Sequence, residues 1–105
     1  MALNENGGEF ISLSEAQGYV SAFRKLNPTA IKGYFAGGEN IQKILAQDGC
    51  IGIRLYNGYD TSGGKTNLVI VGVDEAENDM TEGLILEKLG MCPPFCSPTS
   101  ALYNL

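Results

Sequence analysis

The sequence lacks histidine and tryptophan, and it holds only seven lysines and arginines against twelve aspartates and glutamates. Without histidine, a serine–histidine–aspartate triad, a histidine general base and a histidine-ligated metal are excluded within this chain. The net charge of −5 repels phosphate backbones and anionic lipid surfaces. The few cations form no basic stripe, so we expect neither nucleic acid nor a membrane as a partner.

Long hydrophobic runs are also missing. The longest apolar stretch is Leu68 to Val73, far shorter than the ~20 residues that a membrane span needs. Residues 1–9 have neither the positive nor the apolar segment of a secretory signal, and we expect them to be a flexible lead-in. The three cysteines are too few, and odd in number, for a secreted disulfide scaffold. These absences predict a cytoplasmic protein with free thiols.

What is present fits one small folded domain spanning residues 1–105. A chain of 105 residues has the usual size of a single domain. Its 44% of apolar and 18% of charged residues are typical of a globular protein and too apolar for a disordered one.

Two amphipathic helices are predicted. Ser14 and Gln17 match a capping box for a helix over about 15–26. Gly18 inside this helix predicts a closely packed neighbour, because glycine costs about 1 kcal/mol relative to alanine there. The second helix is predicted over about 39–47. The apolar side chains at helical spacing are Ala16, Tyr19, Val20, Phe23 and Leu26 in the first helix, and Ile41, Ile44 and Leu45 in the second.

The strands are predicted to form a small sheet. Alternation over 50–56 and an apolar run over 68–73 predict an antiparallel hairpin whose long glycine-rich loop is 57–65. Residues 84–86 are expected to return as a third strand. Residues 29–37 fit either a short helix or a strand, and we favour the strand. The predicted fold is α+β, in the order α-β-α-β-β-β, with two helices on one face of a mainly antiparallel sheet.

The C-terminal tail, residues 89–105, has no charged side chain and three of the four prolines. A solvated tail would be charged and poor in apolar residues, so we expect this one to be extended and covered. It would dock either on the parent sheet, with Phe95 as its anchor, or on a neighbouring chain, and the second arrangement would build a homo-oligomer.

Two motifs that resemble ligand sites fail on their context. Gly63-Gly64-Lys65-Thr66 resembles the end of a phosphate-binding loop, but Tyr59 stands where the first glycine is needed and a strand follows. The acidic cluster after the hairpin does not match the spacing of a calcium loop, and a solvated turn is predicted. This cluster contains Asp74, Glu75, Glu77, Asp79 and Glu82.

The cysteines leave three states open. The spacing of Cys92 and Cys96 is permitted in a metal site, but three thiols without histidine fall short of the four ligands zinc prefers. Packed free thiols are favoured, and a short-range disulfide and a metal site are the alternatives. Cys50 follows a helix end and opens a strand, so a buried structural role is predicted. No cofactor is expected.

Arg54 stands mid-strand, on the face opposite Ile53 and Leu55. An exposed arginine on a solvated face is one interpretation, and a contact with a partner or an anion is the other. Tyr56 lies beside Arg54 on that face. The candidate interaction residues are Arg54, Tyr56, Phe95 and Tyr103.

Residues 47–56, 71–74 and 92–96 together resemble a family of small bacterial proteins of similar length with no known activity. The resemblance implies that residues 31–96 form one compact unit, and it implies no catalytic residue. The leading functional hypothesis is a non-enzymatic module that self-associates or binds a protein partner. The alternative is a small thiol or metal-binding protein using Cys92 and Cys96. An enzyme is the weakest class, because the chain has no activated nucleophile and no cofactor motif.

Overall fold

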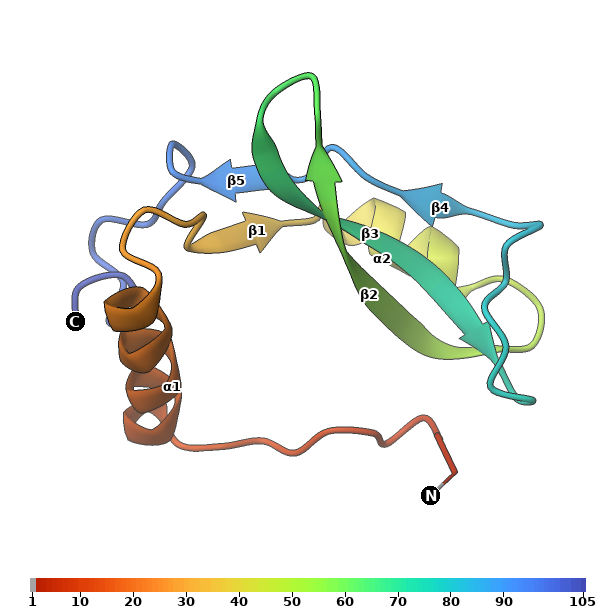
Figure 1. Ribbon diagram of the computed structural model, residues 1–105. Helices are drawn as coiled ribbons and strands as arrows, with labels where there is room; N and C mark the ends of the chain where they lie inside the picture. The colour runs from red at the N-terminus through yellow and green to blue at the C-terminus, as the bar shows by residue number, and fades with distance from the viewer. Residues whose placement is uncertain (1) are drawn as a thin grey trace. The chain divides into compact units, whose positions relative to one another are not determined.

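The computed structural model describes residues 2–105, which cluster into two compact units (Figure 1). The first unit comprises Phe35–Leu89 and the residues up to Gly7, and the second comprises Gly8–Tyr34 and Gly90–Leu105. The elements in chain order are α1 (Leu13–Leu26), β1 (Gly33–Phe35), α2 (Gly38–Leu45), β2 (Cys50–Asp60), β3 (Lys65–Asp74), β4 (Ile85–Leu86) and β5 (Gly90–Cys92).

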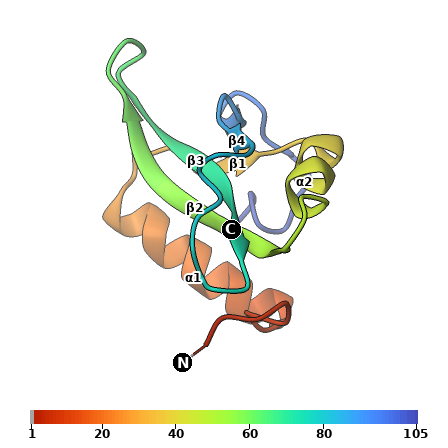
Figure 2. The ribbon, with the colours of Figure 1, turned by 90° about the vertical axis from the view of Figure 1, so that its right-hand side faces the viewer.

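The first unit is built on a three-stranded antiparallel sheet in the order β2-β3-β4. β2 and β3 form a long hairpin whose strands twist around one another (Figure 2). Asp60 closes the hairpin, because its side chain accepts hydrogen bonds from the backbone N–H of Ser62 (2.9 Å) and Gly63 (3.2 Å). Gly64 adopts a φ of 67°, a conformation that glycine adopts without steric cost.

α2 packs against β2 and β3, and the buried side chains of β3 point to both faces of the sheet, Ile70 to one and Val71 and Val73 to the other. Gln47, just after α2, joins three segments. Its Nε2 donates to the carbonyl of Ile44 (2.9 Å), and its Oε1 accepts from the backbone N–H of Leu84 (2.9 Å). The buried apolar side chains are Ile44, Ile70, Val71 and Val73.

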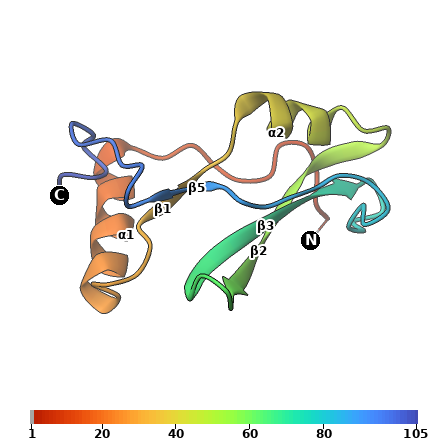
Figure 3. The same ribbon diagram turned by 90° about the horizontal axis from the view of Figure 1, so that it is seen from above.

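The second unit joins α1, the paired strands β1 and β5, and the C-terminal tail (Figure 3). α1 is capped by Ser12, whose Oγ accepts from the backbone N–H of Glu15 at 3.1 Å. The guanidinium of Arg24 donates to the carbonyls of Tyr103 (2.6 Å) and Leu102 (3.1 Å), and it lies 5.4 Å from the Tyr103 ring centre. These contacts hold the tail along α1.

The predicted α+β class is confirmed, with two helices and antiparallel strands in the expected order. The region 29–37 contains a strand, as favoured, and β4 falls within the predicted third strand. In the part of the chain that the structure describes, no helix has both the length and the apolar character that crossing a membrane requires.

Several details of the prediction are corrected. The strands form two sheets instead of one, because the tail contributes β5, which pairs with β1. Of the two helices, α2 belongs to the unit of the three-stranded sheet and α1 to the other unit. The cap of α1 is Ser12 and not Ser14, and a Cβ at Gly18 would meet no atom within 4 Å, so no neighbour packs closely there.

Candidate interaction surface

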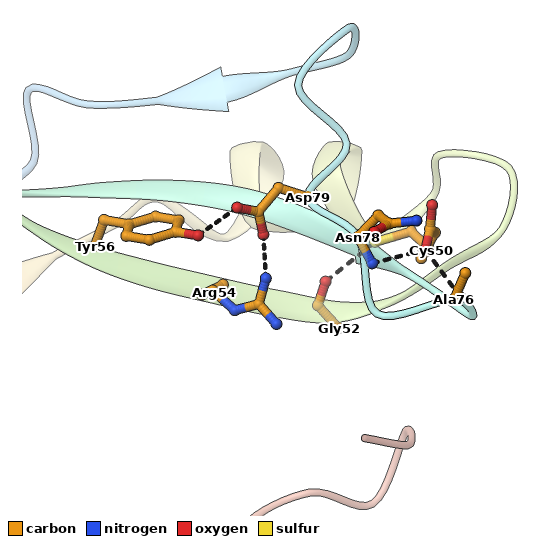
Figure 4. A network of polar contacts seen from close by, with 8 residues as sticks. Cys50, Gly52, Arg54, Tyr56, Ala76, Asn78 and Asp79 are labelled. Carbon is orange, nitrogen blue, oxygen red and sulfur yellow. Dashed lines mark hydrogen bonds and ion pairs between the residues drawn. The ribbon is translucent and has the colours of Figure 1, made fainter. Parts of the chain in front are cut away.

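Arg54 and Tyr56 meet the carboxylate of Asp79 on one face of the first unit's sheet (Figure 4). Arg54 and Tyr56 share this face because alternate residues of a strand point to the same side. Asp79 comes from the loop after β3 and pairs through its backbone with Val73. Val73 pairs with β2 along its other edge, so the Asp79 side chain reaches across β3 to Arg54 and Tyr56.

The turn that precedes Asp79 explains its position. Asp74 Oδ1 accepts hydrogen bonds from the backbone N–H of Ala76 (2.9 Å) and Asn78 (3.0 Å), which folds the chain back beside β3. Glu77 completes the turn with a φ of 69°. The predicted acidic turn is therefore present, but Asp74 and Asp79 have structural partners and are not simply solvated.

These contacts shift the titration of the two charged partners. The hydrogen bond from the Tyr56 hydroxyl, followed by the bond and charge of Arg54, lowers the pKa of Asp79 below its ordinary value. The hydrogen bond to Asp79 raises the pKa of Arg54. Asp79 is therefore a carboxylate at neutral pH, and Arg54 is partnered within its own chain. The prediction of a simply exposed Arg54 is corrected accordingly.

The opposite face of β2 exposes apolar side chains. Ile53, Leu55 and Tyr59 are 36%, 51% and 61% exposed, and they alternate along the strand. β2 is also the outermost strand of its sheet. We call Ile53, Arg54, Leu55, Tyr56 and Tyr59 the β2 surface. In this surface, the unpaired edge of β2 borders both the apolar face and the charged face of the strand.

The tail residues predicted to interact lie in the other unit. Tyr103 packs by its ring on Arg24, so it serves the docking of the tail on α1. Phe95 is 74% exposed, and it does not anchor the tail within the chain as predicted. The polar contacts of Gln17 and Arg24 with the carbonyls of residues 101–103 do so instead. These carbonyls lie in hydrogen-bonded turns, so the predicted extended tail is wrong for this segment.

The structure joins Cys92 and Cys96 in a disulfide, so the favoured prediction of packed free thiols is wrong for this pair. The Cα atoms of the two cysteines are 4.7 Å apart, and Pro93 and Pro94 lie between them. Cys50 is a free thiol and only partly buried, and it donates to the carbonyl of Gly52 at 3.2 Å. Among residues 2–105, no three acidic or cysteine side chains lie close enough together to hold a metal ion.

Comparison with protein-family models, with curated proteins and with solved structures gave no match. The resemblance to small bacterial proteins therefore stays a prediction.

Sequence reasoning selected Arg54 and Tyr56 but missed two members of their surroundings. Asp79 is 25 residues from Arg54 and belongs to the predicted acidic turn, so no local pattern marks it as a partner of Arg54. Tyr59 falls in the predicted loop, although its odd-numbered position puts it on the strand face of Ile53 and Leu55. The apolar alternation is the available signal, and Asn57 interrupts it.

Proposed function

We propose that this chain is a non-enzymatic interaction module that assembles with copies of itself. The observation that carries the proposal is the β2 surface, where an unpaired strand edge adjoins exposed Ile53, Leu55 and Tyr59. Single exposed apolar residues are normal on a protein surface, but an apolar row along a strand edge favours association.

The balance of buried and exposed side chains supports the same proposal. Within residues 2–105, four apolar side chains are buried, whereas eighteen large hydrophobic residues are exposed. Exposed apolar area is a driving force for association, because water is released when two such surfaces meet. Phe95, at the tip of the disulfide loop, is a second apolar contact available to a protein partner.

The concentration dependence of the melting temperature of the full chain tests the proposal. Association stabilises the folded state by mass action, so the melting temperature should rise as the protein concentration rises. For a dimer with a dissociation constant on the order of 1 μM, the protein concentration should be varied from about 0.1 to about 10 μM. A melting temperature that stays the same over this range would count against self-association.

A second candidate function uses the Cys92–Cys96 disulfide. The bond closes a short loop that presents exposed Pro93, Pro94 and Phe95, an arrangement that favours a thiol-based role over a metal-based one. Thiol titration of the native protein, with and without reductant, tests this candidate. A thiol-based role predicts one free thiol, Cys50, in the native protein, two additional thiols after mild reduction, and their loss on reoxidation. Three free thiols before reduction would contradict it.

We also propose that the chain works in the cytoplasm, without nucleic acid or membrane partners, as its charge and composition favour. Because disulfides rarely persist in the cytosol, this proposal expects the Cys92–Cys96 pair to be reduced in cells and oxidised only outside them. Rapid acid trapping of thiols in cells tests this: a reduced Cys92–Cys96 pair supports the cytoplasm, and an oxidised pair contradicts it.

A further inference from the structure

The outer edge of β2 is long and regular. From Ile53 to Asp60, every residue pairs one-to-one with β3, ending at Asp60 opposite Lys65. β2 stands at the end of the strand order, and no other strand of residues 2–105 pairs with its second edge. This stretch leaves a row of backbone N–H and C=O groups about 27 Å long, at roughly 3.4 Å per residue, open to another strand.

Several devices that block such an edge are missing here. Natural sheets protect exposed edges with proline, with charged side chains, lysine above all, or with bulges that twist the strand away. The charged residues of the stretch 53–60 are Arg54 and Asp60, which have opposite signs. The stretch 53–60 contains neither proline nor lysine, and the irregularity of β2 lies outside it, between Cys50 and Gly52. The outer edge of β2 is therefore available for backbone pairing with another strand.

We propose that β2 pairs antiparallel with β2 of a second copy, about a two-fold axis at Asn57. This inference rests on the proposed self-association and specifies its geometry. With the axis at Asn57, positions whose numbers are equally far from 57 lie opposite one another. Leu55 then faces Tyr59 of the partner subunit on one side of the joined sheet. Arg54 faces Asp60 of the partner subunit on the other side.

Each of these pairs is complementary. Leu55 and Tyr59 are among the most exposed apolar side chains of the sheet, and a leucine opposite a tyrosine forms a favourable cross-strand pair. Arg54 donates to Asp79 within its chain, but a guanidinium carries five N–H donors and can also serve a second carboxylate. Tyr56 faces Gly58 of the partner subunit, and because glycine has no side chain this pair leaves the Tyr56 ring free to stay on Asp79.

Neighbouring registers lose this complementarity. An axis at Tyr56 places Arg54 opposite Gly58 and Asp60 opposite Gly52, so neither charge meets an opposite charge. An axis at Gly58 places Arg54 opposite Ser62, which lies in the hairpin turn beyond the strand. Only the axis at Asn57 uses the regular stretch 54–60 from both copies and pairs its two charged residues.

Disulfide trapping tests the register. The full chain carries Asn57→Cys in a Cys50→Ser background, and mild oxidation is followed by non-reducing electrophoresis. Residues directly opposite across antiparallel strands have Cα atoms about 4.5–5.5 Å apart, within the range of a disulfide. Ser62→Cys in the same background is the control, because the axis separates its two copies by about ten residue steps, roughly 34 Å. We expect covalent dimer from Asn57→Cys and none from Ser62→Cys.

A second pair of variants tests the edge itself. Leu55→Lys places a charge at the proposed seam, and it should weaken dimerisation about tenfold or more. Leu45→Lys changes a leucine of similar exposure on α2, and it should leave dimerisation unchanged. Far-ultraviolet dichroism confirms that both variants fold.

The outcomes separate this inference from the proposed function. If the wild type self-associates but Asn57→Cys gives no covalent dimer, or Leu55→Lys dimerises as tightly as Leu45→Lys, the β2 pairing is wrong and the proposed function stands. Equal trapping of Asn57→Cys and Ser62→Cys would also overturn the register. A wild type that is monomeric at every concentration overturns the proposed function itself.

Discussion

Asp79 ties the loop after β3 to the sheet through two partners that lie two residues apart on β2. The Tyr56 hydroxyl and the Arg54 guanidinium both donate to its carboxylate, so the charged form is favoured. Both donors therefore point from β2 towards the loop that follows β3. One acidic residue therefore sets the orientation of the charged face of the β2 surface.

Replacing Asp79 by asparagine should destabilise the protein most at neutral pH. A group whose pKa is lowered by folding contributes stability above its unfolded pKa, near pH 4 for an aspartate, and loses it as the pH falls through the folded pKa. Urea unfolding of Asp79→Asn should therefore show a deficit at about pH 7 that shrinks towards about pH 3. Glu75→Gln, an exposed acid in the same turn, is the matched control. A deficit of equal size at both pH values would contradict this role.

Gly83 is required by the side chain of Gln47. A Cβ at position 83 would overlap Gln47 Oε1, the atom that accepts from the backbone N–H of Leu84. Gly83→Ala should therefore cost about 0.5–1.5 kcal/mol, the usual net contribution of a hydrogen bond whose donor water can still reach. Chemical denaturation measures this cost. Gly38→Ala, where no atom lies within 4 Å of the new Cβ, should be neutral or stabilising, and equal losses in both variants would refute the argument.

At the scale of the elements, the sequence predicted the hairpin but not its length. Asn57 and Gly58 are typical turn residues, so the sequence predicts a loop over 57–65. In the structure the pairing continues to Asp60 and Lys65, and the turn is closed by the Asp60 side chain. Glycine is needed at position 58 of the strand, because a Cβ there would collide with the side-chain oxygen of Asn67 on the opposite strand. Turn propensity is local, whereas register depends on the strand across from it.

The helices also show that a local sequence pattern does not predict long-range contacts. Apolar spacing correctly predicted that α1 is a helix, but it could not say what covers the apolar side chains. No residue of α1 is buried, and Leu26 is 81% exposed. The residues that hold the tail are instead the polar Gln17 and Arg24, which sit on a different side of the helix. Such contacts join residues about eighty positions apart, and no spacing rule reaches that far.

We expect Arg24 to contribute most to the docking of the tail on α1. Arg24→Ala removes two hydrogen bonds to tail carbonyls and the contact with the Tyr103 ring. Residues 98–105 should therefore exchange their amide hydrogens faster. The melting temperature should also fall, by about 4–8 °C for each kcal/mol of stability lost. Hydrogen exchange with mass spectrometry measures the local effect. Lys25→Ala, the exposed neighbouring cation, is the control. Unchanged exchange in the tail of Arg24→Ala would show that other contacts dock it.

At the scale of the whole molecule, the central feature is the mismatch between a small buried core and many exposed apolar side chains. A chain of 105 residues buries less of its surface than a larger protein does, and it gains more from association. Pairing two β2 edges would cover Leu55 and Tyr59 and satisfy the open backbone groups of both copies at once. Stability and assembly would then be linked, and dilution would weaken both.

The solution mass of the full chain, measured by light scattering behind size-exclusion chromatography over a dilution series, tests this account most directly. Self-association through β2 predicts a mass of twice 11.2 kDa at high concentration, falling towards 11.2 kDa on dilution. Leu55→Lys should shift that transition to higher concentration. A mass of 11.2 kDa at every concentration would contradict the account.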